Sequence, residues 1–501
     1  MRFIITSIFC LLTIVGSLSS QVLSSQTISE VNTSEYDVFL DGKINNYKIV
    51  KLDYKDYLED ASKMQYFSSF ELEIDESESW DIQLLPQHHL VENLKVYTPS
   101  LGYLDKPLNV YPYAGYLLGN SETEVRLTFG EDFIYGFWQG QGSSNRFIEP
   151  LFNVIPGVDS DLYIVYNGHD VVFSDEEFCA SSQLKSKTKG MQNAQKMTSV
   201  GLCYEVDVST ASDFLMYTKY GSNITTLTNH NVGVMNNVQM NYDDEFADEL
   251  QFQLNEQWIS DCSTCDPWSS TLDAGDLLFS FRNWANGNPS GFDEIHDVGQ
   301  LWTDRNIESN GNSGTVGIAY VGVVCGSFRY QVLEDFTSNA NFLRVMVAHE
   351  LGHNFDAVSS SGTGHDPPGS SWIMAPSVSN VSQWSPASIS DIEGYYNGIN
   401  CMAACAPPVP PVAAFSASLT DICPGATIQF FDESTASPTS WLWVFPGGTP
   451  GTSTDESPIV TYNTPGVYSV TLTATNGIGS DMVTVPGFID VSFSGTDVVL
   501  A

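Results

Sequence analysis

The sequence predicts three folded regions: a mostly β region, an α/β region with one histidine-bearing helix, and a C-terminal β-sandwich. Short apolar runs alternate with turns over residues 21–197. Strand-like and helix-like periodicity alternate over residues 198–405, and a strand–turn rhythm returns over residues 413–492. The 501 residues leave room for two to four domains of ordinary size.

An excess of acidic residues limits the classes of partner. The chain has 60 Asp and Glu against 19 Lys and Arg, which gives a formal charge of −41. Such a field argues against nucleic acid and anionic membranes, and it favours solubility and divalent cations, so structural Ca²⁺ is a candidate cofactor. Because 42% of the residues are hydrophobic and only 16% are charged, the chain is not a disordered acidic polymer.

Residues 1–20 have the pattern of a signal peptide. Arg2 supplies the positive end, a short apolar run follows, and small residues close the segment. A membrane anchor is the alternative reading, but the run is too short to span a bilayer comfortably. No later segment looks transmembrane. We therefore expect a secreted, extracellular protein in which disulfides can form.

The first folded region, residues 21–197, ends in a lysine-rich linker. Residues 47–52, 125–129 and 162–166 read as strands, which indicates a mostly β domain. Residues 185–190 contain three lysines in a very acidic chain. They are an exposed processing site or, with nearly equal weight, a plain solubilising linker. A trypsin-like protease would find several sites here and very few in the regions that follow.

The α/β region begins near Val200. Residues 203–208 alternate as a first strand, residues 226–241 carry apolar side chains at helical spacing, and residues 250–254 alternate again as a strand. This succession of elements predicts an α/β region.

The most informative segment is His349-Glu350-Leu351-Gly352-His353, an H-E-x-x-H sequence. On a helix, residues four apart share a face, so His349 and His353 can present two imidazole nitrogens to one Zn²⁺. Glu350 then lies beside the open side of the metal, where it can take a proton from water. Apolar residues at helical spacing precede the motif, which indicates a buried helix leading into the site.

Downstream residues add to this pattern and point to a family. His365-Asp366 and then Met374, within Ile-Met-Ala-Pro, follow the motif. Together these residues resemble the metzincins of the reprolysin or adamalysin type, whose pattern is H-E-x-x-H-x-x-G-x-x-H-D followed by a methionine-containing turn. The resemblance implies an α/β metzincin catalytic domain, with a mixed twisted sheet and an active-site helix. It also implies that this domain hydrolyses peptide bonds as a zinc metalloendopeptidase. It also implies that Met374 shapes the floor of the site.

The resemblance assigns a role to each residue of the motif. His349, His353 and His365 would hold one catalytic Zn²⁺, and Glu350 would act as general base and then as proton donor. The substrate would be a protein or peptide.

Two departures affect the third zinc ligand. The family glycine, which lets the chain leave the helix, aligns with Asp356, and the segment before His365 is longer by several residues. We therefore expect the exit to be made later, at Gly362 or Gly364. Asp356 is the competing third ligand because carboxylate oxygens also bind zinc. The neighbouring Asp366 and the Met374 context favour His365.

The resemblance also extends to the flanking segments. Residues 113–127 and 147–150 are similar to the reprolysin propeptide, more loosely than the zinc motif, which implies a proenzyme. In that family a propeptide cysteine can occupy the fourth zinc position as thiolate, and Cys179 could do so here; a structural or unpaired cysteine is an equal alternative. Residues 314–325 resemble the segment with the edge strand that pairs with an extended substrate, whereas a buried core strand is the alternative.

Six cysteines in the α/β region predict three disulfides. Their pairing does not follow from sequence; by resemblance, Cys325 should pair with Cys401 or Cys405. Cys262 and Cys265 could suggest zinc or redox chemistry, but no second C-x-x-C accompanies them, so a structural bridge is favoured. Cys423, in the last region, has no obvious partner.

A proline-rich linker, residues 406–412, precedes the last region, and residues 493–501 form a tail after it. The segments 441–448 and 462–476 strongly resemble a polycystic kidney disease (PKD) domain, which implies a β-sandwich that serves as spacer or adhesion unit. Trp441 and Trp443 could bind a glycan or a protein, but at least one is expected in the core.

A second hypothesis belongs to another class of function. The altered Asp356 and the long loop before His365 would also fit an adhesion or binding protein whose metzincin fold has lost efficient zinc binding. Zinc content and the effect of Glu350→Ala distinguish the two hypotheses.

Overall fold

The computed structural model divides the chain into two compact units, Met1–Cys405 and Ala406–Ala501. No helix among the described residues is long and apolar enough to cross a membrane. The structure describes residues 21–27, 34–52, 69–75, 78–104, 109–118, 120–130, 133–139, 145–155, 157–172, 178–179, 203–246, 249–287, 291–357, 364–405, 410–434, 438, 440–476 and 479–492. The expected signal peptide and the lysine-rich linker lie outside these residues.

The N-terminal part of the first unit is a closed β-barrel with short helices between its strands. The segments predicted as strands are strands, and their alternate residues fill the barrel with Leu, Ile and aromatic side chains. Around the barrel the order is β1 (Gln21–Thr27), β2 (Tyr47–Leu52), β11 (Leu162–Asn167), β10 (Arg146–Pro150), β9 (Phe133–Gln139), β8 (Asn120–Gly130), β7 (Val110–Leu117), β4 (Glu78–Pro86) and β3 (Ser69–Asp75). The short helices are α1 (Ser34–Leu40), η1 (His88–Leu90), α4 (Leu151–Val154) and η2 (Gly168–Asp170).

The rest of the first unit is built on a second, mixed sheet. Its central strands are parallel, β16 is antiparallel to β17, and the apolar runs of the central strands are buried on both faces. The order is β12 (Phe178–Cys179), β16 (Thr315–Ala319), β17 (Tyr330–Glu334), β15 (Val298–Thr303), β13 (Tyr204–Ser212), β14 (Leu250–Ile259), β5 (Lys95–Thr98) and β6 (Gly102–Tyr103), with β18 (Ala403–Ala404) paired to β13. Three of these strands, β5, β6 and β12, come from the chain before residue 180.

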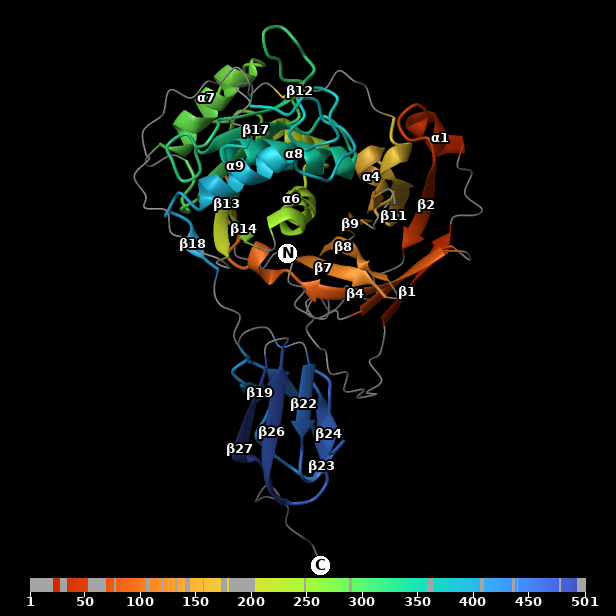
Figure 1. Ribbon diagram of the computed structural model, residues 1–501. Helices are drawn as coiled ribbons and strands as arrows, with labels where there is room; N and C mark the ends of the chain where they lie inside the picture. The colour runs from red at the N-terminus through yellow and green to blue at the C-terminus, as the bar shows by residue number, and fades with distance from the viewer. Residues whose placement is uncertain are drawn as a thin grey trace, which may run out of the picture. The chain divides into compact units, whose positions relative to one another are not determined.

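Helices cover both faces of this sheet (Figure 1). Leu333 of β17 packs in the cluster that contains α6 and α8, whereas its neighbour Val332 packs in the cluster that contains α7. Side chains at N-terminal cap positions, among them Asn339 and Ser385, accept backbone N–H groups and so define where several helices begin. The helices are α5 (Phe214–Lys219), α6 (Ile224–Phe246), α7 (Ala274–Ala285), α8 (Ala340–Asn354) and α9 (Pro386–Tyr396).

Helix α6 lies between the barrel and the sheet, and its buried residues include several asparagines. It contacts β7, β8 and β9 of the barrel and also β14 and α8. Asn236 donates to the carbonyl oxygens of Tyr113 and Leu127 on the barrel. A Cβ on Gly233 would lie 2.6 Å from the Tyr135 ring, so glycine permits the close packing. The barrel therefore rests on the same helix that supports the site.

The disulfides confirm the prediction of three bridges. Cys325 pairs with Cys401, and the remaining bridges are Cys203–Cys405 and Cys262–Cys265. Cys179 is free and buried, and Cys423 is free and exposed. The Cys203–Cys405 bridge joins the segment 401–405 to the start of β13, and the Cys325–Cys401 bridge joins it to the loop after β16.

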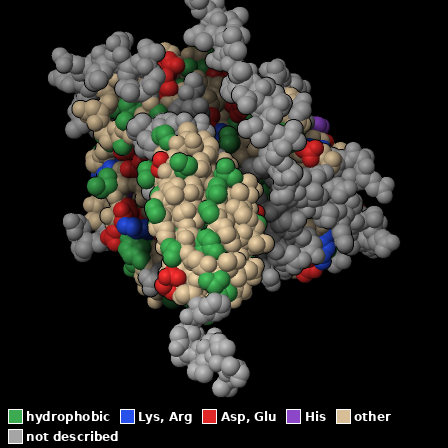
Figure 2. Space-filling model, turned by 90° about the horizontal axis from the view of Figure 1, so that it is seen from below, with side chains coloured by type: hydrophobic (Ala, Val, Ile, Leu, Met, Phe, Trp, Pro, Cys, Tyr) green, Lys and Arg blue, Asp and Glu red, His purple; other side chains and the backbone are tan. Residues whose placement is uncertain are grey.

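The second unit is a sandwich of two sheets. Trp441 and Trp443 are both buried, so their rings belong to the core and are not a binding platform. The unit contains no Lys, Arg or His. The few basic groups on the face of the molecule in Figure 2 therefore belong to the first unit. Its strands are β19 (Phe415–Ala417), β20 (Asp421–Ile422), β21 (Ala426–Asp432), β22 (Ser440–Val444), β23 (Gly448–Thr449), β24 (Thr452–Ser453), β25 (Ile459–Tyr462), β26 (Gly466–Thr475) and β27 (Ser480–Val491).

Candidate metal centre

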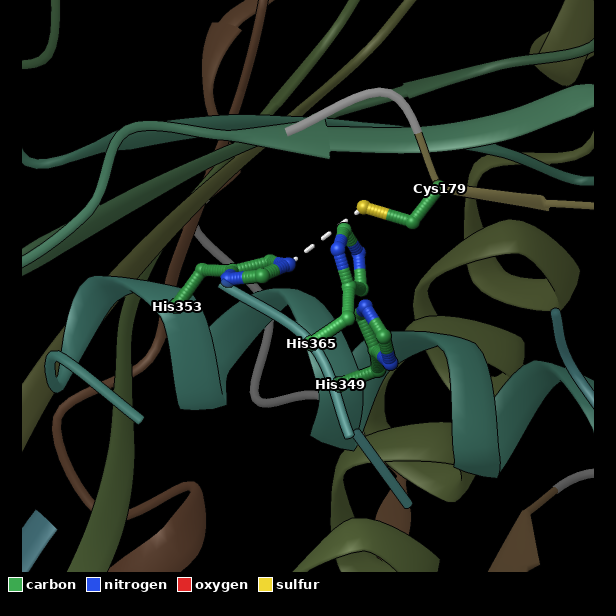
Figure 3. Close-up of side chains that lie close together, drawn as sticks. All are labelled: Cys179, His349, His353 and His365. Carbon is green, nitrogen blue, oxygen red and sulfur yellow. Dashed lines mark hydrogen bonds between the residues drawn. The ribbon is translucent and has the colours of Figure 1, made fainter. Parts of the chain in front are cut away.

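Three histidines and one cysteine meet at α8 (Figure 3). The ring centroids of His349, His353 and His365 are 4.8 to 5.3 Å apart. One ligand atom from each of these histidines and from Cys179 lies within 4.8 Å of all the others, and all four residues are buried. The Cys179 Sγ lies 3.4 Å from His353 Nε2. The structure therefore brings together the three histidines that the sequence singled out.

Helix α8 is held rigidly, which fixes where its two histidines point. All of its residues are buried. One turn before His349, the guanidinium of Arg344 donates to the Asn241 side chain of α6 at 2.6 Å and to the carbonyl oxygen of Val381 at 2.8 Å. The helix is thus linked to α6 on one side and to the loop before α9 on the other.

The hydrogen bonds and burial of the histidines suit them as neutral ligands. His349 Nδ1 lies 2.7 Å from the carbonyl oxygen of Ile373, which directs its Nε2 into the cluster. Burial, reinforced by the neighbouring His365, lowers the pKa of His349 to about 3, and burial likewise lowers the pKa of His353. Neutral imidazole is the form that binds a metal.

The donor set fits Zn²⁺. Imidazole nitrogen and cysteine sulfur are the ligands that Zn²⁺ prefers, and four of them suit its tetrahedral geometry. The Nε2 atom of His349 is buried without a hydrogen-bond partner among the described residues. A buried polar atom of this kind costs free energy unless something binds it, and a metal ion at the cluster would do so.

Glu350 lies against β16, beside the cluster. Its side chain is buried, and a Cβ on Gly317 of β16 would lie 2.4 Å from Glu350 Oε1. Glycine at 317 therefore leaves the space that the carboxylate fills. The sequence identified Glu350 but carried no signal for Gly317, because this contact joins two segments that are distant in the chain.

The chain leaves α8 at Asp356, earlier than the sequence suggested. Asp356 has a φ of +66°, its N–H bonds to the carbonyl of His353, and the N–H of Ala357 bonds to that of Gly352. This is the Schellman arrangement, in which glycine is usual but Asp is tolerated. The expected exit at Gly362 or Gly364 is therefore wrong: Gly364 also has positive φ, but the helix has already ended, and Gly362 lies outside the described residues.

His365, and not Asp356, joins the cluster. Among the residues that the structure describes, the ligand group contains no Asp356. The N–H of Asp366 bonds to the carbonyl of Met374 at 2.8 Å, which links the segment of His365 to the methionine turn. A Cβ on Gly352 would lie 2.7 Å from Met374 Sδ, so this turn packs directly under the helix.

The strand β12 covers the edge of β16. Phe178 pairs with Thr315 and Cys179 with Gly317, in parallel orientation, and the N–H of Cys179 bonds to the carbonyl of Pro376. Without β12, β16 would be an open edge strand of the sheet. The same two residues therefore cover the edge and deliver the thiol to the histidines.

Comparison with known proteins agrees with this geometry. Residues 204–385 match a reprolysin model described as Metallo-peptidase family M12, and residues 413–486 match the PKD domain. A protein from Cerberus rynchops named "Zinc metalloproteinase-disintegrin-like" is 29% identical over 160 residues. That match covers 31% of this chain and 24% of the relative, so this chain spans about a quarter of the relative's length.

Proposed function

The chain is a reprolysin-type metzincin with a C-terminal PKD domain, and on this premise we propose that it is a secreted zinc-dependent endopeptidase made as a proenzyme. The observation that carries the proposal is the meeting of His349, His353 and His365 beside Glu350, at the edge of β16. Its substrates would be proteins or peptides.

In this proposal His349, His353 and His365 hold Zn²⁺. A zinc ion bound there supplies Lewis-acid chemistry, polarising a scissile carbonyl and lowering the pKa of water. The packing of α8 keeps both of its histidines on one face, and the Ile373 carbonyl keeps His349 in the required tautomer.

Glu350 moves the protons of hydrolysis. Its carboxylate takes a proton from the attacking water and then gives it to the leaving amine. Once β12 has left, the edge of β16 would hydrogen-bond the backbone of an extended substrate and hold the scissile bond near Glu350. Burial of Glu350 against Gly317 supports this role because it leaves the carboxylate little freedom.

Latency would come from the N-terminal region. Cys179 occupies the fourth position of the ligand group, where its thiolate would exclude water, and β12 occupies the edge that a substrate needs. Cleavage in the lysine-rich linker, residues 185–190, would cut the connection to this region.

Structural Ca²⁺ and a PKD ligand remain parts of the proposal. Asp207 and Asp297 lie close together, since the N–H of Asp207 donates to Asp297 Oδ2 at 3.0 Å. Burial raises the pKa of both carboxyl groups, that of Asp297 to about 6, and a divalent cation would offset the free-energy cost of burying their charges.

A glycan or protein ligand of the PKD domain would have to use groups other than the buried Trp441 and Trp443.

The structure does not support the reasons for the alternative, a binding protein without zinc. It rested on Asp356 and on the long loop, but Asp356 ends the helix and His365 reaches the cluster.

The test is cleavage of a denatured protein by the linker-cleaved chain, with wild type and Glu350→Ala compared. His169→Ala, which removes an exposed histidine of the N-terminal region, is the matched control. We expect activity in wild type and control and none in Glu350→Ala. Undiminished activity in Glu350→Ala would refute the mechanism, and inactivity of all zinc-loaded forms would refute the enzyme.

A further inference from the structure

A hairpin from the N-terminal region extends the second sheet at the edge opposite to β12. The hairpin, residues 95–103, consists of β5, a turn and β6, and β5 lies beside β14. Sequence reasoning missed it, because its four-residue strand carries no signal that it joins a distant sheet. Without the hairpin, β14 would be the edge strand at this side.

The hairpin binds β14 as one peptide strand binds another. β5 is parallel to β14, with Lys95 opposite Glu256 and Tyr97 opposite Trp258. The Val96 carbonyl accepts the N–H of Leu104, so Val96 faces β6. The N–H and C=O groups of successive residues point to opposite sides of a strand. Those of Lys95 and Tyr97 therefore point toward β14. Any extended segment could make these backbone contacts.

The side chains make the contact selective. Lys95 Nζ lies 2.5 Å from Glu294 Oε1, and the Tyr97 ring stacks on that of Trp258 with centroids 6.4 Å apart. The basic and the aromatic residue are two positions apart, so their side chains lie on the same side of the strand. The edge thus pairs an acidic group with an aromatic surface.

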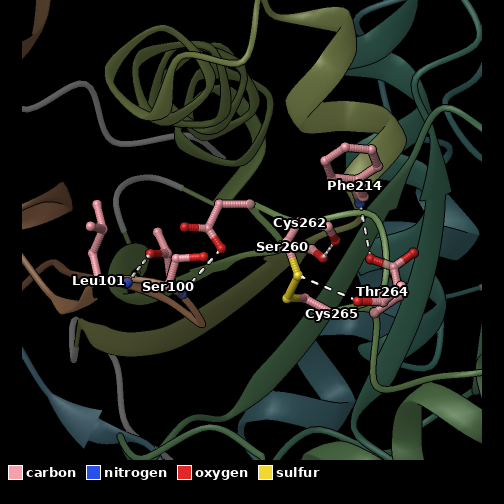
Figure 4. Close-up of a disulfide and its surroundings, with 10 residues drawn as sticks. Ser100, Leu101, Phe214, Ser260, Cys262, Thr264 and Cys265 are labelled. Carbon is pink, nitrogen blue, oxygen red and sulfur yellow. Dashed lines mark hydrogen bonds between the residues drawn. A yellow bond between two sulfur atoms is a disulfide. The ribbon is translucent and has the colours of Figure 1, made fainter.

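Glu256 organises the acidic wall. Its Oε2 accepts the N–H groups of Asp293 and Glu294 at 2.9 Å, which fixes the loop that carries Glu294. The Tyr103 hydroxyl donates to Asp293 Oδ2 at 2.9 Å. In Figure 4 the turn of the hairpin lies beside the loop of the Cys262–Cys265 disulfide, where the N–H of Ser100 donates to Asp261 Oδ1 at 3.2 Å. The acceptors for the hairpin therefore belong to preformed loops of the α/β region.

An acidic cavity of about 560 Å³ adjoins Lys95. On the side of the α/β region it is lined by the carboxylates of Glu205, Asp207 and Glu294, and residues 92–95 of the N-terminal region form its other side. The three carboxylates remain when the N-terminal region is released, and they would attract further basic side chains that precede the strand.

We infer that removal of the N-terminal region uncovers β14 as a second peptide-binding edge. Its partner is an extended segment of a protein substrate in which Lys or Arg stands two residues before an aromatic residue. The inference rests on the proposed function, since the edge is uncovered only when the N-terminal region is released. It concerns a site at the opposite edge of the sheet from the histidines, so it needs neither zinc nor catalysis.

The probe is a fluorescein-labelled peptide with the sequence of residues 93–104, measured by fluorescence anisotropy. All proteins are full chains that carry Glu350→Gln, which prevents self-cleavage. They are tested intact, after trypsin cleavage of the linker, and intact with Tyr97→Pro, which removes an N–H that faces β14. Amide hydrogen exchange over residues 253–258 reports whether β14 has been uncovered.

We expect the intact chain to bind no peptide and the uncovered forms to bind it. Glu294→Lys should weaken binding at least about threefold, and a Lys95→Glu peptide should recover that loss. Glu433→Lys, in the other compact unit, is the charge control and should have no effect.

Three results would overturn the inference. The uncovered forms could bind the peptide no better than a scrambled one. Peptides with Lys95→Glu or Tyr97→Ser could bind the uncovered chain with Glu294 intact as well as the original peptide does. Finally, β14 could stay protected in every form, so that the edge is never uncovered. Because the readout is binding by a catalytically disabled chain, failure here leaves the proposed protease function standing.

Discussion

The contact between Gly317 and Glu350 permits a quantitative prediction. A Cβ at 317 would lie 2.4 Å from Glu350 Oε1, whereas non-bonded heavy atoms need about 3.5 Å. Gly317→Ala therefore requires a relative shift of about 1 Å between the carboxylate and β16. His349 and His353 should stay in place, because both lie on α8 and the Ile373 carbonyl also holds His349.

A displacement of this size is large for a catalytic group. A misplacement of about 1 Å can lower turnover about 100-fold, which corresponds to about 3 kcal/mol of transition-state stabilisation. The added methyl group should also lower the free energy of unfolding by about 1–3 kcal/mol. We expect a much reduced kcat, little change in KM and unchanged bound zinc.

The assay is the rate of peptide hydrolysis by linker-cleaved chains, with zinc content measured on the same samples. Gly394→Ala is the matched control, because a Cβ there meets no atom within 4 Å. Unchanged turnover in Gly317→Ala would refute the placement of Glu350 against β16. Loss of zinc together with activity would show that β16 holds the histidine cluster.

The remaining predictions concern latency, backbone strain and pH. Cys179→Ser should raise the activity of the uncleaved full chain, because a serine hydroxyl does not ionise as a thiol does; no rise, or an equal rise in Cys423→Ser at the exposed free cysteine, would contradict the role of Cys179. Asp356→Gly should raise the free energy of unfolding by about 1 kcal/mol in a urea titration, since glycine adopts the +66° φ without strain; a decrease would show that the aspartate side chain is worth more than this strain. Burial raises the pKa of Glu149, beside Tyr166 on the barrel, to about 8 from 4.5. The native state then holds a proton that the unfolded state releases, so this contribution is fully present below pH 4.5 and is lost as pH rises toward 8. Glu149→Gln should flatten the fall in urea midpoint between pH 5 and pH 8, and an unaltered slope would assign it to other groups.

The features that sequence reasoning predicted well are those set by local spacing. His349 and His353 share a face because they are four residues apart on one helix, and that geometry needs no knowledge of the rest of the chain. The strands of the barrel and the buried core of the second unit likewise follow from alternation of apolar residues. The order of the regions along the chain was legible for the same reason.

Features that depend on long-range packing were not predictable. Whether the chain leaves α8 at Asp356 or later depends on a backbone conformation that Asp adopts only with support from its surroundings. The placement of Cys179 beside His353 joins residues 174 positions apart, and the sequence left it balanced against a structural role. The addition of β5 and β6 to the sheet depends on an edge that exists only after the fold has formed.

The most direct test of the central claim is the number of zinc ions bound per chain, measured by atomic emission on the full chain as wild type, His365→Ala and Asp356→Ala. We expect one zinc in wild type, one in Asp356→Ala, and loss of zinc in His365→Ala. Zinc retained in His365→Ala and lost in Asp356→Ala would contradict the ligand set, and a well-folded wild type that binds no zinc would contradict the enzyme itself.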